Sequence, residues 1–376
     1  MSGTVDAGPE AGWAGGWLTI DLDAIVANWR ALRDRAAPAE CAAVVKADAY
    51  GLGIEQVAPA LDRAGCRTFF VAHLAEGVVL RRLLAPDRVV FVLNGVPPGT
   101  ASAFVTHGLL PVLNSLGQVA EWRATAIEAG RPLPASVQID TGMSRFGLSP
   151  QEVAGLAAQP DGLTGIEIRL VMSHLGCADT PDHPANEEQL ASFERLASLL
   201  PPAPRSLAAS SGIFLDSRYH LDLVRPGVAL YGVPPTAQRP NPMRPVIRLQ
   251  ARVVQTRRVQ PGDWVGYGAT FRAMRPTDVA TLAIGYADGF LRASGGGVAS
   301  LSDGGPMLPI IGRISMDSLA IDVTDIPADK VRDGMPLDLI GPHRPLEDAA
   351  DAAGTIGYEL LTSLGNRYHR SWHGSP

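Results

Sequence analysis

The chain has 376 residues, a length that favours two domains or a barrel with an added domain. Hydrophobic residues make up 46% of it and charged residues 19%, which is typical of a folded globular protein and not of a disordered one. The net charge of −6 and the scattered basic residues exclude broad, non-specific nucleic-acid binding, because neutralising phosphates requires clustered Lys and Arg.

The cysteines and the N-terminal residues indicate a compartment. Cys41, Cys66 and Cys177 are odd in number and widely spaced, so they indicate neither a disulfide framework nor a zinc site. Residues 1–16 lack the basic and apolar regions of a signal peptide, and no apolar run approaches the roughly 18 to 20 residues that span a bilayer. We therefore expect a cytoplasmic protein with a flexible leader over residues 1–16, no metal and no membrane contact.

Residues 17–243 alternate short apolar runs with amphipathic stretches, which predicts repeated β-α units. The helical stretches include residues 23–36 and 186–199, with Asp or Asn near the start and Gly or Pro near the end. Nearly unbroken apolar runs are typical of parallel strands covered by helices. A barrel and a doubly wound open sheet share this rhythm, so it does not choose between them. The eight expected strands are 18–22, 42–45, 69–72, 89–93, 110–113, 137–139, 166–172 and 205–208.

The proline-rich stretch 234–245 predicts a linker, and the rhythm changes after it. Residues 244–376 read as a second, mainly β domain with one or two helices near its end. Its expected strands are 246–259, 279–284, 308–314, 319–323 and 337–340.

Lys46 directly follows one of the apolar runs expected in the barrel. Active sites of barrels are built at the carboxyl ends of the strands, where a partly buried lysine can lose its proton and form a Schiff base. After the last run come residues 209–212 (ASSG) and 225–228 (RPGV), whose hydroxyls and backbone N–H groups suit a phosphate. Each feature alone is more often an ordinary loop or turn. Together they indicate pyridoxal phosphate.

A series of motifs is more specific than any single residue. The segments VVKADAYG, IDTGMSRFGL, MSHLG, SSG, LVRPGVALYG, VGYGATF, AIGYADGF, GRISMD and GYELLTSLGNR occur in this order. In order and spacing the chain resembles the alanine racemases, a fold type III pyridoxal-phosphate family, from about Trp17 to Arg370. The resemblance, and not the periodicity, implies an α/β fold with a (β/α)8 TIM-type barrel followed by a mainly β C-terminal domain.

The resemblance also implies roles for residues of the barrel. Lys46 would be bound to the cofactor aldehyde, Arg225 would face the pyridine nitrogen and His174 would pack beside the ring. Arg145 would lie near the substrate carboxylate. The remaining contacts with the cofactor phosphate would come from Tyr50, Ser211, Gly227, Val228 and, in the second domain, Tyr358.

Other residues of the second domain are expected to complete the site of a partner subunit. Tyr267 resembles the second catalytic base, Met316 and Asp317 resemble contacts with the substrate carboxylate, and Tyr286 would narrow the entrance. The resemblance therefore implies a homodimeric isomerase that interconverts L-alanine and D-alanine by a two-base mechanism and supplies D-alanine for peptidoglycan.

A two-base mechanism makes demands on Tyr267. A free tyrosine has a pKa of about 10, so it is a poor base unless nearby positive charge or hydrogen bonding favours its phenolate. Our hypothesis is that Arg225 and His174 supply this field, through a chain that runs from the pyridine nitrogen to Tyr267. Arg225 would donate to the ring nitrogen without readily protonating it.

Gln138 departs from the family pattern. Many alanine racemases carry there a lysine modified by carbon dioxide, which holds the carboxylate-binding arginine. An amide can accept a hydrogen bond from Arg145 but carries no negative charge, so we expect no carbamate.

Three other functions stay open from the sequence. One is racemisation of another small amino acid such as serine. Another is a non-catalytic pyridoxal-phosphate carrier, which would lack the second domain. A related decarboxylase is the third, although no cysteine lies in the C-terminal half to resemble its usual catalytic partner.

Overall fold

The computed structural model describes residues 12–159, 161–237 and 240–374. The chain divides into two compact units: residues 24–244, here called the barrel unit, and residues 1–23 with 245–375, here called the β unit. No helix in the described ranges is long and apolar enough to cross a membrane. The two units are described in turn.

The strands of the barrel unit close into a parallel barrel in its described part. A seven-stranded parallel sheet runs in order from β3 to β9. The eighth strand, β10, pairs in parallel with β2, and β2 continues into β3 across Ala42, whose N–H donates to Val224 O at 3.0 Å. On its other side β10 is joined to β9 through Arg225 N and Ala208 O at 2.9 Å. The strands are β2 (Glu40–Cys41), β3 (Ala43–Val44), β4 (Thr68–Val71), β5 (Val89–Val92), β6 (Leu110–Leu113), β7 (Leu133–Gln138), β8 (Ile166–Met172), β9 (Arg205–Ser206) and β10 (Leu223–Val224).

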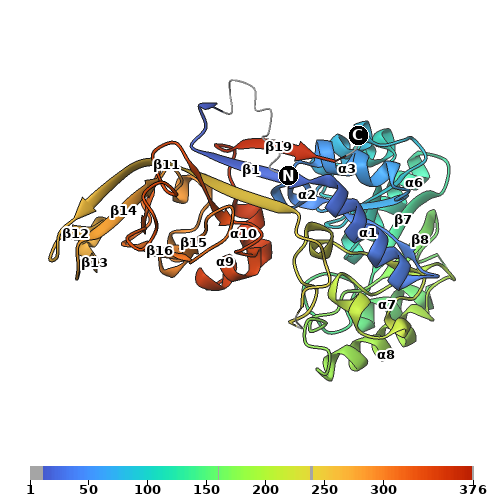
Figure 1. The fold of residues 1–376 in the computed structure, drawn as a ribbon. Helices are drawn as coiled ribbons and strands as arrows, with labels where there is room; N and C mark the ends of the chain where they lie inside the picture. The colour runs from blue at the N-terminus through green and yellow to red at the C-terminus, as the bar shows by residue number, and fades with distance from the viewer. Residues whose placement is uncertain (1–11, 160, 238–239, 375–376) are drawn as a thin grey trace. The chain divides into compact units, whose positions relative to one another are not determined.

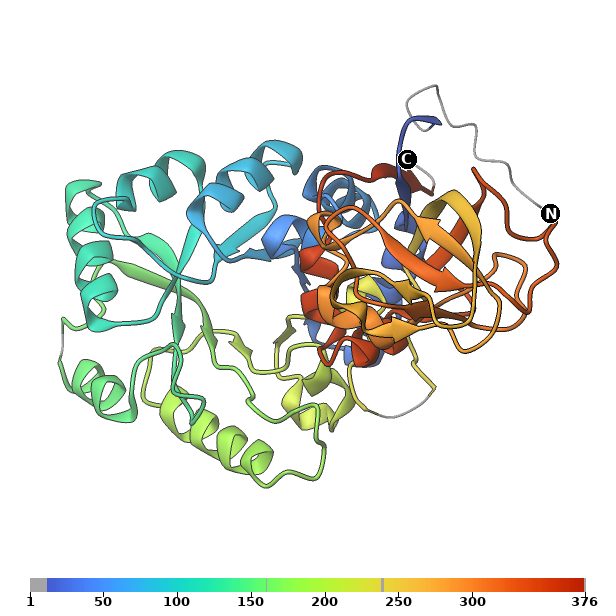
Figure 2. The same ribbon diagram turned by 90° about the vertical axis from the view of Figure 1, so that its left-hand side faces the viewer.

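Helices surround these strands, as Figure 2 shows for the cyan to green segments. Because both faces of the sheet are covered, strands such as β4 are buried along their whole length, and Phe69, Phe70, Phe104 and Phe193 are fully buried in the core. The helices are α1 (Leu22–Ala36), α2 (Lys46–Gly51), α3 (Ile54–Arg63), α4 (Leu74–Leu83), α5 (Ala101–His107), α6 (Leu116–Glu128), α7 (Pro150–Ala158) and α8 (Ala185–Ala197).

The barrel has the expected number of strands, but one expected member is wrong. The run 18–22 lies in β1 (Gly16–Asp21), which belongs to the β unit. Residues along β1 alternate between buried and half-buried, as in a sheet with one covered face, and this alternation distinguishes β1 from the barrel strands. The true last strand, β10, has two residues, too few to show a periodicity.

The β unit is built around β11 (Ile247–Val259), which pairs with β1, β14 and β18 (Figure 1). The strand order is β15-β16-β17-β14-β11-β1-β19, and β12 and β13 form a separate hairpin near one end of β11. The other elements are β12 (Trp264–Val265), β13 (Phe271–Arg272), β14 (Thr277–Leu282), β15 (Val298–Ala299), β16 (Leu308–Ile311), β17 (Leu319–Asp322), β18 (Pro336–Ile340), β19 (His369–His373), α9 (Leu346–Ala352) and α10 (Gly357–Ser363). A mainly β second domain with helices near its end is confirmed.

The expected leader is only partly within the described residues. Residues 1–11 lie outside them. Residues 12–15 are attached to β11, because Arg252 N donates to Gly15 O at 2.8 Å and the Arg252 side chain donates to Ala14 O at 2.9 Å and Gly12 O at 3.0 Å. The short segment before β1 is therefore part of the β unit.

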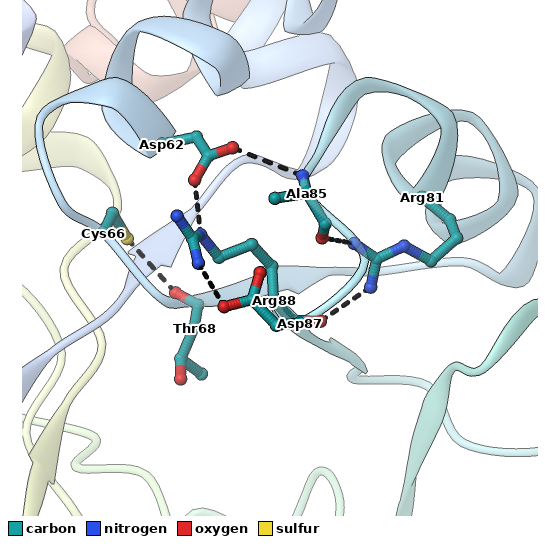
Figure 3. A network of polar contacts seen from close by, with 7 residues as sticks. All are labelled: Asp62, Cys66, Thr68, Arg81, Ala85, Asp87 and Arg88. Atoms are coloured by element: carbon teal, nitrogen blue, oxygen red, sulfur yellow. Dashed lines mark hydrogen bonds and ion pairs between the residues drawn. The ribbon is translucent and has the colours of Figure 1, made fainter.

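A polar network braces the amino ends of β4 and β5 (Figure 3). Asp62 accepts from Arg88 Nε and, at 3.3 Å, from Ala85 N, while Arg81 donates to Arg88 O at 2.6 Å. The active sites of barrels lie at the opposite, carboxyl ends of the strands. We therefore assign this network to the stability of the barrel.

Candidate active site

The predicted residues of the barrel unit follow different strands and meet at their carboxyl ends. Lys46 comes after β3, Arg145 after β7, His174 after β8 and Arg225 after β10. The charges of Arg225, Arg145 and Lys46 all lower the pKa of His174, so the four side chains share one electrostatic environment. The structure thus brings these predicted residues together at the mouth of the barrel.

The Lys46 amine is partly buried between charges of opposite sign. Burial lowers its pKa below the ordinary value, the positive charge of Arg145 lowers it further, and the carboxylate of Glu76 acts in the other direction. A lowered pKa makes the unprotonated amine more available, and the unprotonated form is the nucleophile. Lys46 therefore has the environment expected of a lysine that attacks an aldehyde.

The chain after Lys46 forms a left-handed turn. Residues 47 to 50 have φ values of 52° to 56°, although none of them is glycine. Left-handed helical geometry costs L-residues roughly 1–2 kcal/mol each. Two carboxylates hold the turn: Glu76 accepts from Ala47 N at 2.7 Å, and Asp48 accepts from Ile54 N at 2.7 Å. Strain of this kind often accompanies functional sites.

Glu76 is a site residue that the sequence analysis missed. One of its oxygens accepts from Ala47 N, and the other accepts from Ala72 N at 2.8 Å and His73 N at 3.0 Å. It therefore ties the lysine turn to the beginning of α4 and also acts on the pKa of Lys46. A Glu three residues after the N-cap His73 of α4 indicates at most a helix start, and it gives no sign of a role in the site.

Tyr50 and Gly227 form a cradle of the kind that a phosphate needs. A Cβ atom added to Gly227 would lie 2.3 Å from the Tyr50 hydroxyl and 3.4 Å from Cβ of Val44. Gly227 has an ordinary φ of −121°, so glycine is needed there for close approach and not for backbone conformation. The Tyr50 hydroxyl consequently reaches the backbone beside Val228, as the prediction requires.

Ser210 shapes the other side of this loop. Its buried Oγ accepts from Gly227 N at 3.0 Å and from Ala229 N at 3.2 Å. Gly227 N is therefore already paired, and the space beside Gly227 is taken by the Tyr50 hydroxyl. Ser211 begins the 3-10 turn η2 (Ser211–Phe214) next to Ser210. The Ser210 hydroxyl therefore holds the loop that carries Val228.

Arg225 is a buried cation held by neutral groups. Its side chain, 3% exposed, donates to Ser173 O at 2.5 Å, to Leu207 O at 3.4 Å and to the hydroxyl of Ser206. Burial lowers the pKa of Arg225 to about 9, which still leaves it charged at neutral pH. A charged donor among neutral partners suits an acceptor such as a pyridine nitrogen. This cation, the Lys46 amine and the Tyr50 cradle fit a phosphorylated aromatic aldehyde.

The environment of His174 favours its neutral form, whereas the hypothesis from the sequence lets it supply positive charge. Burial, followed by the charges of Arg225, Arg145 and Lys46, lowers its pKa to about 3. It therefore cannot supply positive charge to a phenolate at neutral pH. Any positive field at this mouth comes from Arg225 and its cationic neighbours, and His174 can serve as a neutral ring or hydrogen-bond partner.

Gln138 does not accept a hydrogen bond from Arg145 in the structure. Its buried side chain donates to Phe146 O at 3.4 Å instead, and the Arg145 guanidinium lies 5.8 Å from the centre of the Phe146 ring. The loop between them is shaped by Asp140, which accepts from the N–H groups of residues 142 to 144 at 2.9 to 3.1 Å. Backbone bonds to Asp140 thus fix the loop that carries Arg145.

A polar cavity of about 480 Å³ opens beside Arg145. Its lining comes from the loops that follow β5, β6 and β7: Asn94, Asn114, Ser115, Gln118, Asp140, Ser144, Arg145, Phe146 and Gly147. A volume of this order is typical of small-molecule sites.

The β unit gathers its own predicted residues on adjoining loops. Tyr267 begins the turn η5 (Tyr267–Ala269), and Tyr286 begins the turn η6 (Tyr286–Asp288). Tyr286 N donates to Ser315 O at 3.1 Å, and Ala287 N donates to Met316 O at 2.9 Å. A Cβ atom on Gly268 would lie 2.6 Å from Nη1 of Arg313, so the Tyr267 loop also packs against the segment that leads to Met316.

These gathered side chains are open to solvent. Tyr267 is 69% exposed, and Tyr286 and Met316 are exposed as well. The carboxylate of Asp317 pairs with Arg367 at 2.7 Å, so a contact of Asp317 with a negatively charged substrate would have to come from its backbone N–H. Tyr358 lies in α10, and its contact with the cofactor phosphate stays a prediction.

Comparisons with known proteins agree with this arrangement. Residues 20–235 match the family model described as alanine racemase, N-terminal domain, and residues 246–372 match alanine racemase, C-terminal domain. A Mesorhizobium japonicum protein named "Alanine racemase, catabolic" is 52% identical over 96% of this chain and 94% of its own length. A Brucella canis alanine racemase is 50% identical over 95% of this chain and 93% of its own length. A crystal structure of Bartonella henselae alanine racemase with covalently bound pyridoxal phosphate has a TM-score of 0.92 and 43% identity, covering 96% of this chain and 100% of that one.

Proposed function

Because the chain belongs to the alanine racemase family, we propose that it interconverts L-alanine and D-alanine with pyridoxal phosphate as its cofactor. It is then an isomerase. The observation that carries the proposal is the group of Lys46, Tyr50, Arg225 and Gly227 at the carboxyl mouth of the barrel. There an amine with a lowered pKa lies with a buried cation and a tyrosine hydroxyl packed closely against a glycine.

In this proposal most of the groups that would hold the cofactor belong to the barrel unit. Lys46 would be bonded to its aldehyde carbon, Arg225 would donate to its ring nitrogen, and His174 would pack against the ring as a neutral group. Tyr50, Ser211, Gly227 and Val228 would hold the phosphate, and Tyr358 of the β unit is the proposed fifth contact.

Two bases on opposite sides of the substrate explain how a racemase removes and returns one proton. Pyridoxal phosphate, when bound, withdraws electrons from the α-carbon of an amino acid and so makes its α-proton more acidic. The Lys46 amine, free when the substrate has taken its place, would take up or donate a proton at the α-carbon on one face. The Tyr267 phenol of the partner subunit would donate or take up a second proton on the opposite face. Arg145, with Met316 and Asp317 of the partner subunit, orients the substrate carboxylate, and Tyr286 narrows the entrance.

A homodimer is part of the proposal. It is supported by the solvent exposure of Tyr267, Tyr286 and Met316, which lie on adjoining loops of the β unit instead of in its core. Exposed aromatic and methionine side chains are enriched where proteins meet.

The metabolic direction is a separate question from the reaction. Supply of D-alanine for peptidoglycan is one proposed role. Use of alanine as a nutrient is favoured by the Mesorhizobium japonicum relative, whose name includes the word catabolic. A deletion strain that grows normally without D-alanine, but no longer on D-alanine as carbon source, would support the nutrient role.

The reaction is tested by incubating purified protein and pyridoxal phosphate with L-alanine and measuring D-alanine on a chiral column. L-serine and L-lysine, assayed in parallel, determine the substrate range. We expect alanine to be the best substrate, and we expect Lys46→Ala to abolish its conversion and to leave no cofactor trapped by borohydride.

Arg33→Gln, an exposed change on α1, is the matched control and should behave as the wild type. Bound cofactor without racemisation of any of the three amino acids would instead support a non-catalytic carrier. Absence of both would contradict the whole proposal.

A further inference from the structure

A buried arginine in the β unit has no role in the proposed reaction. Arg344 lies between β18 and α9 and is only 2% exposed. Its backbone is fixed in a tight turn, because Gly341 N donates to Arg344 O at 2.8 Å and Arg344 N donates to Gly341 O at 3.1 Å. The side chain that leaves this turn lies inside the unit.

The hydrogen-bond donors of the Arg344 guanidinium are unpaired in the described part of the chain. Within the described residues, none of its three nitrogens has a hydrogen-bond partner. Asp348 acts on it only through charge, which raises the pKa of Arg344, while burial has the larger and opposite effect and lowers it to about 10. Arg344 therefore remains a cation at neutral pH, and an uncompensated buried cation strongly destabilises a fold.

Ser294 adds a second donor of the same kind. Its hydroxyl is fully buried and, among the described groups, also lacks a partner. It belongs to the 3-10 turn η7 (Arg292–Gly296), and the next residue, Gly297, lies directly against the arginine. A Cβ on Gly297 would be 2.6 Å from Nη2 of Arg344 and 3.1 Å from Ser294 O, so the guanidinium and the Ser294 turn are neighbours.

The glycine at position 297 makes this approach possible. Its φ of −82° is one that any residue can adopt, so backbone conformation does not require glycine there. What it provides is room for the guanidinium. Another arginine of the same unit has the usual carboxylate partner: Arg248 pairs with the buried carboxylate of Asp338 at 3.0 Å.

From these contacts we propose that Arg344 and Ser294 bind a small inorganic anion of the halide class inside the β unit. A halide carries a negative charge and could contact the guanidinium directly. No described neighbour of Arg344 places a negatively charged group within hydrogen-bond distance of it. A halide accepts hydrogen bonds from any direction, and it is small. The bound anion would join the β18–α9 turn to η7, which follows the Tyr286 loop along the chain.

Crystals of the holoenzyme grown with bromide in place of chloride test the site directly. We expect an anomalous bromide peak within hydrogen-bond distance of the Arg344 guanidinium. Water molecules alone at the guanidinium, or the Asp348 carboxylate bonded to it, would overturn the proposal. This test needs no variant and does not depend on racemase activity, so its failure is distinct from failure of the proposed function.

Thermal unfolding of the holoenzyme supplies a second test. Replacing gluconate by chloride at about 0.1 M and constant ionic strength should raise the melting temperature of the wild type by about 2 °C, because a ligand that binds only the folded state stabilises it. Arg344→Met should lose this shift, and Ser294→Ala should reduce it.

The control is Arg275→Met, which removes an arginine paired at the surface with Asp325 and should keep the full shift. Equal melting temperatures of the wild type in the two salts would count against the site, as would an unchanged shift in Arg344→Met. If Arg344→Met does not fold, the bromide crystals decide.

Discussion

The Lys46 amine shows how single residues set the chemistry of the barrel mouth. Arg145 lowers its pKa and Glu76 raises it, with burial as the largest influence. Only the unprotonated amine attacks an aldehyde, so the rate of cofactor capture by the apoprotein should follow the titration of Lys46.

Removing either charge should therefore shift the pH dependence of cofactor capture, in opposite directions. Arg145→Gln removes a charge that lowers the pKa of Lys46, so the midpoint should move to higher pH. Glu76→Gln removes a charge that raises it, so the midpoint should move to lower pH. Each shift should be a few tenths to about one pH unit, measured as borohydride-trapped cofactor against time.

Arg195→Gln, an exposed change on α8, is the control for these two variants and should keep the wild-type midpoint of cofactor capture. Shifts of the same sign in Arg145→Gln and Glu76→Gln would show that neither charge acts on Lys46 as described. A loss of capture in Glu76→Gln at all pH values would instead point to collapse of the left-handed turn, which a crystal structure of the variant would reveal.

Tyr267 is the residue on which the two-base proposal depends. In Tyr267→Phe, solvent deuterium should enter the α position of one alanine enantiomer at least about 10²-fold more slowly than in the wild type, because one proton-transfer group is gone. Exchange of the other enantiomer, which uses Lys46, should be affected much less. Mass spectrometry of each enantiomer in heavy water measures both rates. Wild-type exchange of both enantiomers would remove Tyr267 from the mechanism.

Residues that act through other residues were harder to find in the sequence than residues that act directly. Lys46, Arg225 and Tyr267 lie in motifs with distinctive neighbours. Glu76 and Ser210 act by accepting backbone N–H groups from segments distant in sequence, Ala47 and Gly227. Such partners become visible only when the strands close into a barrel, so no local pattern could have shown that these two side chains support the site.

Among the elements, the left-handed turn after Lys46 is the most strained in the barrel unit. Ala47 is exposed and has a φ of 52°, so its side chain contributes strain without compensating burial. Ala47→Gly should relieve this strain and stabilise the protein by up to about 1 kcal/mol, whereas Ala47→Val should destabilise it by about 1–2 kcal/mol. Urea unfolding of the two variants measures the difference.

The rate of cofactor capture by Lys46 is a second measurement on the Ala47 variants. If the strain serves to place the Lys46 amine, Ala47→Gly should capture the cofactor more slowly despite its higher stability. Ala120→Gly, at an exposed position inside the right-handed α6, is the control and should only lose stability. Equal losses of stability in Ala47→Gly and Ala120→Gly would contradict the assigned turn.

The elements also show where periodicity fails as a guide. Short apolar runs such as those at β4, β5 and β6 were placed correctly to within one residue, because parallel strands covered by helices need continuous apolar surface. β1 and β10 were not. β1 has one covered face and pairs with β11 and β19, partners more than 200 residues away, while β10 is two residues long. Both assignments depend on pairing that sequence spacing does not contain.

For the whole molecule, each unit carries only part of the proposed site. The barrel unit holds the proposed cofactor-binding residues except Tyr358, and the β unit holds Tyr358 and, on exposed loops, Tyr267, Tyr286, Met316 and Asp317. The order of motifs along the chain could predict both sets. It could not show that Arg313, Ser315 and Gly268 bring the loops of the second set together, since these contacts join segments about 30 to 45 residues apart.

Mixing two inactive variants tests whether a partner subunit completes the site. Lys46→Ala and Tyr267→Phe should each be nearly inactive alone. In a mixed dimer, one site would carry both changes and the other would be intact, so purified mixed dimers should have about half of the wild-type activity. Activity is measured after co-expression with two different affinity tags and purification through both.

The double variant Lys46→Ala/Tyr267→Phe, co-expressed with the wild type, is the matched control. Its mixed dimers have one Lys46→Ala site and one Tyr267→Phe site if the residues come from different subunits, and should be nearly inactive. If both residues of a site came from the same chain, the outcomes would be reversed: the mixed single variants would stay inactive, and the dimers of wild type and double variant would keep one working site. The two arms thus give opposite results for a shared and an unshared site.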